Sequence, residues 1–143
     1  MRSRDWMVAL FALLAGAAHA EVTASNAWIR GMVPGQKTTA AYLTLRSTED
    51  AKVVGVSSAV AGMAMLHTSS IVSGVAHMDS LDALKLPAGK AVELKPGGDH
   101  VMLMNVARPL RHGDTVPLTF TIEDSKGKRS KVEVNAAVRP IAE

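Results

Sequence analysis

Cysteine is absent from this chain of 143 residues. Its absence excludes thiol nucleophiles, disulfide redox chemistry and metal sites that depend on thiolate ligands. It also removes the residue that carries a lipoprotein anchor, so we expect no lipid attachment. If the chain is exported, disulfides are permitted outside the cytoplasm but not used, and the core must hold the fold unaided.

Aromatic residues are also few, with two Trp, one Tyr and two Phe in the whole chain. Only Trp28, Tyr42 and Phe120 lie beyond the first 20 residues. The formal net charge is +3, and the basic residues are scattered along the sequence. A nucleic-acid surface needs clustered positive charge and stacking rings, so we expect no nucleic-acid partner.

Long apolar runs are missing, apart from a shorter one near the N-terminus. Arg2 and Arg4 precede the run "WMVALFALLAGAA", and "AHA" before Glu21 has the small-x-small form of a signal-peptidase site. The run is too short to span a bilayer, which takes about 20 residues. We therefore predict a signal peptide over residues 1–20 and one exported, monomeric domain over residues 21–143 without a membrane anchor.

Helical periodicity is missing after Glu21, where the chain reads as short β-segments separated by turns. "TTAAYLTLRS" and "PLTFTIED" alternate in the β pattern, and "MVPGQ", "KPGGD" and "DSKGK" supply turn residues. We expect at most one helical turn, in "SLDALK". Strands at this spacing without intervening helices favour an all-β sandwich or barrel. The predicted strands are 21–31, 39–47, 52–60, 63–72, 74–78, 90–95, 99–107, 114–123 and 129–138.

Methionine and histidine, in contrast, occur together on the same short segments. In a β-strand, every second side chain points to the same face, so residues at alternate positions form a row. Two such rows combine a histidine with two methionines. They are Met63, Met65 and His67 in "MAMLHT", and His100, Met102 and Met104 in "HVMLM".

Imidazole nitrogen and thioether sulfur are uncharged metal donors, and the sulfur is soft. Thioethers select Cu(I) over hard cations, which prefer oxygen, and over zinc, which prefers thiolate and imidazole. His100 and Met102 lie about 6.6 Å apart between Cα atoms on one strand face, so both side chains can reach one ion. A neighbouring strand would supply the other donors.

The remaining histidines and methionines have simpler interpretations. Most strand methionines fill a core, and we assign Met63 and Met104 to that role, while Met65 stays open between core and site. His112 lies in the turn "RPLRHGD", where a solvated side chain is expected. His77 has the opposite strand parity to Met78 and is expected to point to solvent.

The spacing of four of these residues resembles the His-x10-Met-x21-His-x-Met signature of the periplasmic copper chaperones of the PCuAC type. The matching positions are His67, Met78, His100 and Met102. "AWIRGMVPGQKTTAAYLTLRS" and "LKPGGDHVMLMNVARPLRHGDTVPLTFTIED" are also similar to that family, and the resemblance covers nearly all of residues 21–138. Thr68 stands where many members carry another methionine. The ending "VRPIAE" lacks the His- and Met-rich tail of some members, which argues against a second, Cu(II)-binding site.

The resemblance implies a cupredoxin-like Greek-key β-sandwich or barrel that binds one Cu(I) near its surface. It implies His67, Met78, His100 and Met102 as ligands, and a periplasmic, non-enzymatic carrier. Such a carrier delivers copper to the dinuclear centre of cytochrome c oxidase, through transient contact with the copper-bearing subunit or another copper carrier.

Other functions remain open from the sequence. One is copper tolerance by sequestration, and another is a metal-free secreted β-sandwich that serves as an interaction module. A blue-copper electron carrier needs a cysteine thiolate, which the chain lacks. A copper enzyme acting on oxygen would reveal itself by turnover in air with a reductant.

Overall fold

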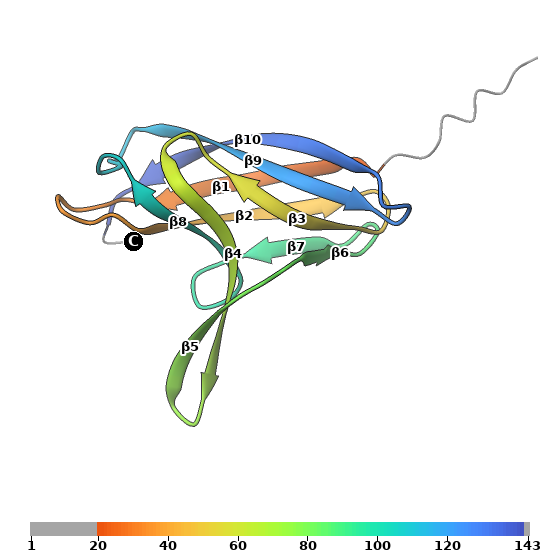
Figure 1. Cartoon of the computed structure of the whole chain (residues 1–143), viewed down its shortest axis with the longest axis horizontal. Helices are drawn as coiled ribbons and strands as arrows, with labels where there is room; N and C mark the ends of the chain where they lie inside the picture. The colour runs from red at the N-terminus through yellow and green to blue at the C-terminus, as the bar shows by residue number, and fades with distance from the viewer. Residues whose placement is uncertain (1–19, 142–143) are drawn as a thin grey trace, which may run out of the picture.

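The computed structural model describes residues 20–141, and this region consists of β-strands and connecting turns (Figure 1). Within these residues no helix is long and apolar enough to cross a membrane. The predicted signal peptide falls almost entirely on residues 1–19, which lie outside the described residues. The strands are β1 (Val22–Arg30), β2 (Thr39–Ser47), β3 (Ala51–Ser57), β4 (Ala61–Val72), β5 (Val75–Ser80), β6 (Leu84–Leu86), β7 (Ala91–Leu94), β8 (His100–Val106), β9 (Thr115–Asp124) and β10 (Arg129–Arg139).

The strands form one hydrogen-bonded sheet in the order β5-β4-β8-β2-β1-β10-β9-β3-β6, and β7 also pairs with β2. Residues 39–41 of β2 pair with β8, and residues 43–46 pair with β7. Only β1 and β10 run parallel among these pairs. Although β3 and β4 are far apart in this order, they contact each other, because the sheet curls around its core. The all-β prediction is confirmed.

The hydrophobic core lies on the inner face of the curled sheet. Along β9, buried residues alternate with more exposed ones, and Phe120 in the middle of the strand is fully buried. On β2 and β8, the same alternation buries Ala41, Val101 and Leu103 completely. The opposite faces of β2 and β8 are therefore free to carry other chemistry.

One element differs from the sequence prediction in type. The helical turn expected in "SLDALK" is wrong, because Leu84–Leu86 form β6, which pairs with β3. Leu84 and Leu86 are buried while Lys85 between them is exposed. This alternation places two leucines in the core, and their burial decides the conformation of this short segment.

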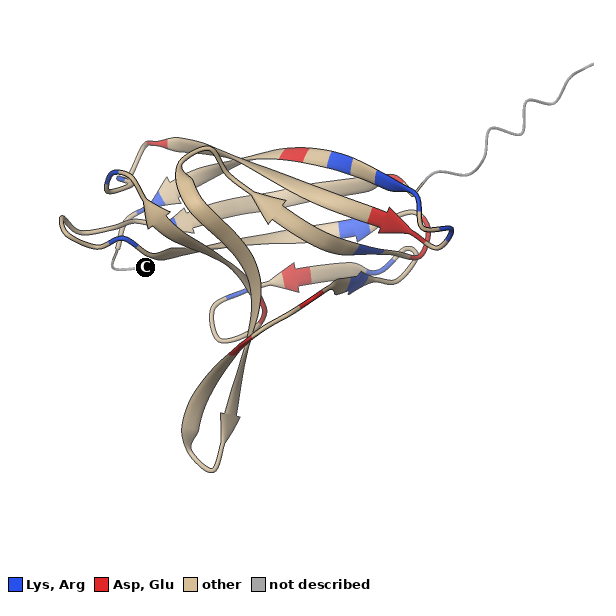
Figure 2. Cartoon of the chain, viewed as in Figure 1, with Lys and Arg blue, Asp and Glu red and all other residues tan. Residues whose placement is uncertain are grey.

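A hairpin of β4 and β5 projects away from the rest of the fold (Figure 1). We call residues 69–78 the arm. Its two-residue turn has φ angles of +52° at Ser73 and +78° at Gly74, a geometry that matches the twist of paired strands. Residues 69–78 contain no Lys, Arg, Asp or Glu, and Figure 2 shows the uncharged ribbon of the arm below the sheet.

Candidate metal centre

The antiparallel pairing of β4 with β8 brings the two predicted His/Met rows together. Residues that pair directly in antiparallel strands project their side chains to the same face. The rows therefore form one ladder on the outer face, while Leu66 and Val101 of the same strands are buried in the core. The pairs of this ladder are His67 with His100, Met65 with Met102, and Met63 with Met104.

The assignment of Met63 and Met104 to the core is wrong. Met63 is 50% exposed, and Met104 is only partly buried. On β8 the core positions belong to Val101 and Leu103, so alternation turns Met104 outward together with His100. Met65, left open by the sequence, is also partly buried on this outer face.

The two histidines at one end of the ladder are close neighbours. Their ring centroids are 5.8 Å apart, with an angle of 61° between the ring planes. His100 is 4% exposed, and its Nδ1 lies 3.0 Å from the carbonyl oxygen of Gly98. A carbonyl only accepts, so Nδ1 carries the proton and Nε2 keeps a free lone pair for a metal.

His67 has a polar atom that the protein leaves unsatisfied. Its Nδ1 is buried and has no hydrogen-bond partner among the described residues. A buried donor or acceptor without a partner costs about 1–3 kcal/mol. A metal ion bound through this nitrogen would remove that cost, so the residue fits a ligand role.

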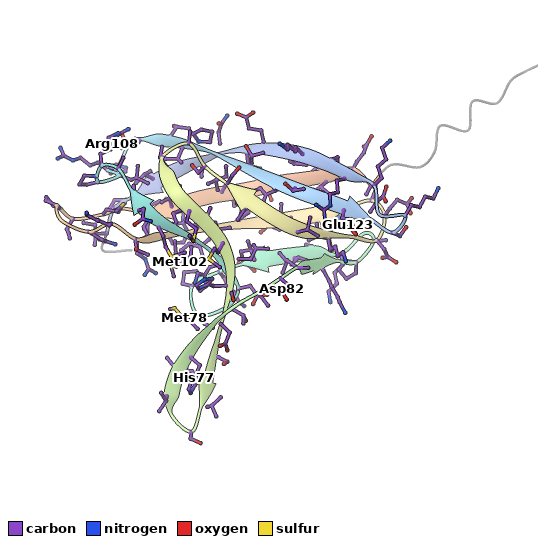
Figure 3. All side chains as sticks on the ribbon, in the orientation of Figure 1. His77, Met78, Asp82, Met102, Arg108 and Glu123 are labelled. Atoms are coloured by element: carbon purple, nitrogen blue, oxygen red, sulfur yellow. The ribbon has the colours of Figure 1, made fainter. Side chains whose placement is uncertain are left out.

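Met78 approaches the same face from the arm. It pairs with Ser69, which is two positions beyond His67 on one face of β4. Met78 is 61% exposed, and with His100 and Met102 it lines a cavity of about 410 Å³. Figure 3 shows Met78 where the arm leaves the sheet, below Met102.

The two histidines expected at the surface are there. His77 is exposed on β5, and it pairs with Ser70 on the opposite face of the hairpin from Met78. His112 is exposed in the turn before β9. Both predictions of solvent exposure are confirmed.

Two aromatic residues that the sequence analysis did not connect with the site lie beside it. Tyr42 of β2 is nearly buried, and its ring centroid is 6.4 Å from that of His100 and 4.6 Å from that of Trp28. Arg30 lies over the Tyr42 ring, with its guanidinium carbon 5.8 Å from the ring centroid. Only strand pairing reveals this neighbourhood, because β1 and β2 are distant in sequence from β8, which carries His100.

The donor atoms at this face are imidazole nitrogens and thioether sulfurs. Among residues 20–141, no three His, Asp or Glu side chains come together as a metal cluster. A metal here would therefore depend on thioethers as well as on the histidine pair, and such a mixed set suits a soft ion.

The sequence of the chain matches a known protein family and is similar to a known protein. A profile of the family described as "Putative lipoprotein LpqE-like" matches residues 22–138. "Putative lipoprotein Lxx21020" of Leifsonia xyli subsp. xyli is 34% identical over 116 residues, which cover 79% of this chain and 68% of that protein.

Solved structures share the fold. DR1885 from Deinococcus radiodurans in its Cu(I) form is 36% identical, with a TM-score of 0.62 over 90% of this chain and 85% of that one. The copper-bound PCuAC domain of PmoF2 has a TM-score of 0.65 at 22% identity, over 86% of this chain and 99% of that domain. The predicted cupredoxin-like fold is confirmed by these similarities. The profile match over residues 22–138 and the 34% identical relative show that the chain belongs to the LpqE-like family.

Proposed function

We propose that the protein is a Cu(I) carrier that binds one ion through His67, His100, Met102 and Met78. The observation that carries this proposal is the register of β4 and β8, which sets the two histidines opposite each other beside a thioether. Uncharged, partly soft ligands favour Cu(I) over zinc and over hard cations. The Cu(I) form of DR1885, at 36% identity, supports copper as the metal.

The exposure of Met78 supports transport rather than catalysis. Met78 is 61% exposed and lies on the projecting arm, so a partner can reach it and displace it from an ion. Thioether ligands also suit an oxidising compartment, because methionine forms no disulfide. We infer a non-enzymatic carrier.

We propose that this carrier works in the periplasm and delivers copper to the dinuclear centre of cytochrome c oxidase. The signal-peptide pattern and the lipoprotein names of the relatives support export. Transient contact with the oxidase's copper-bearing subunit, or with another copper carrier, would use the arm. There Ile71 and Val75 are exposed apolar side chains on a segment without charges.

Copper tolerance by sequestration is the second candidate function. Met63, Met65 and Met104 extend the thioether row beyond the four proposed ligands, which would provide donors for further Cu(I). Stoichiometry separates the two functions, because a carrier binds one ion and a store binds several.

A competitive titration tests the proposal. The purified protein is titrated with Cu(I) under a reductant, against a chromophoric Cu(I) chelator, and with Zn(II) in parallel. We expect one Cu(I) per chain, bound far more tightly than zinc, and a more than tenfold loss of Cu(I) affinity in His100→Ala.

His77→Ala is the matched control, because His77 adjoins Met78 in sequence but lies on the other face of the hairpin. It should leave the affinity unchanged. Tighter binding of zinc than of Cu(I), or equal losses in the two histidine variants, would refute the site.

A further inference from the structure

Arg30 places a positive charge beside the proposed copper site. It is the last residue of β1, and its side chain lines the same cavity as Met78, His100 and Met102. Its guanidinium carbon is 5.8 Å from the ring centroid of Tyr42, and that ring is 6.4 Å from His100. The charge therefore faces the cavity from the strand two places away from β8.

A row of paired residues leads from Arg30 across β2 to Met102 of β8. Ala40 of β2 pairs with Met102 of β8, and the neighbouring Thr39 hydroxyl donates to the carbonyl of Arg30 over 2.7 Å. Two strand spacings, about 10 Å, thus lie between the backbones of Arg30 and Met102. Ala40 is the residue of β2 between them, and the Tyr42 ring adjoins both Arg30 and His100.

No carboxylate among the described residues forms an ion pair with Arg30. Within residues 20–141, the ion pairs join Lys52, Arg108 and Arg129 to acidic side chains, and none of them involves Arg30. A guanidinium keeps its proton in proteins. Arg30 is also partly buried, so solvent screens its field less than on an open surface.

We propose that Arg30 makes the site selective for Cu(I) over Cu(II); this inference rests on the proposed function. The four ligands are neutral, so the bound ion keeps its full charge. A fixed positive charge repels a divalent ion twice as strongly as a monovalent one at the same position. The factor by which Arg30 weakens Cu(II) binding is therefore the square of the factor for Cu(I), and this difference favours the reduced state of the bound copper.

The test compares Arg30→Gln with the unmodified protein for both oxidation states. Cu(I) is titrated under ascorbate against a chromophoric chelator, and Cu(II) is titrated without reductant against an amino-acid competitor, both at low ionic strength. We expect about a threefold gain in Cu(I) affinity and about a tenfold gain in Cu(II) affinity, with smaller gains at high salt. In Arg30→Gln the affinity for Cu(II) thus rises about threefold relative to the affinity for Cu(I). This lowers the reduction potential of the bound copper by about 30 mV, since a tenfold ratio corresponds to 59 mV for one electron.

Two control variants separate charge from packing. Arg30→Lys keeps the charge and should retain the selectivity, and Lys37→Gln removes an exposed charge that does not line the cavity. Equal gains for both ions in Arg30→Gln, or the same gains in Arg30→Lys, overturn the inference. If the unmodified protein does not bind Cu(I), the proposed function fails, and the inference with it. If it binds Cu(I) and Arg30→Gln changes neither affinity, the inference alone fails.

Discussion

The two histidines of the candidate centre differ in how the protein holds them. His100 is buried, and its Nδ1 proton is donated to the Gly98 carbonyl, which fixes both the tautomer and the orientation of the ring. His67 has a buried Nδ1 without a protein partner. The ring of His100 is thus oriented before an ion arrives, whereas a bound ion would supply the partner that Nδ1 of His67 lacks.

Among the methionines, we expect position on the sheet, and not exposure, to decide the effect of a substitution. Met78 and Met63 are 61% and 50% exposed and lie on the same face, but Met63 sits at the far end of the ladder. Met78→Ala should lower Cu(I) affinity more than tenfold, and Met63→Ala should leave it nearly unchanged. Both should change the free energy of unfolding by less than about 0.5 kcal/mol, as surface substitutions do. Chelator competition and urea unfolding measure the two quantities, and equal affinity losses would contradict the ligand set.

At the scale of elements, the arm holds Met78 in place through its turn. Gly74 and Gly127 have φ angles of +78° and +80°, and a Cβ on either would meet no atom within 4 Å. Valine at either position is therefore strained only by its backbone conformation, which costs about 1–3 kcal/mol.

We expect the same backbone strain to have different consequences in Gly74→Val and in Gly127→Val. Gly74→Val should loosen the exposed arm and weaken Cu(I) binding several-fold, with little effect on global unfolding. Gly127 lies in the turn between β9 and β10, and both strands carry core residues. Gly127→Val should therefore lower the free energy of unfolding without changing the affinity for Cu(I). Chelator titration and thermal unfolding of both variants check this, and an unchanged affinity in Gly74→Val would show that the arm does not position a ligand.

At the scale of the whole molecule, the proposed ligands come from β4, β5 and β8, so binding would tie the arm to the sheet. An ion that binds only the folded state stabilises it by about 2.7 kcal/mol at a free concentration 100 times Kd. For a domain of this size that corresponds to a rise in Tm of about 10 °C. Calorimetry under a reductant should show this rise with Cu(I) in the unmodified protein and in Met63→Ala. The same rise in His100→Ala would mean that copper stabilises the fold from another place.

Several features follow from the sequence alone. Alternation predicted the strands other than β6, including β2 at residues 39–47, and it set His100 and Met102 on one face, because the strand period is two wherever the strand lies. The same parity placed His77 opposite Met78. The choice of the four ligands came from the spacing of residues and stays a prediction.

The tertiary structure decided what alternation leaves open. Alternation puts Met104 in one row with His100 and Met102, but it does not say whether the core extends under that row. The burial of Val101 and Leu103 shows that the core meets the opposite face of β8, which leaves Met63 and Met104 outside it. The pairing of His67 with His100, and the approach of Tyr42 and Arg30 from β2 and β1, depend on strands distant in sequence. Their register is set by the packing of the whole curled sheet, because only the complete set of strands buries the core, and no local segment contains that information.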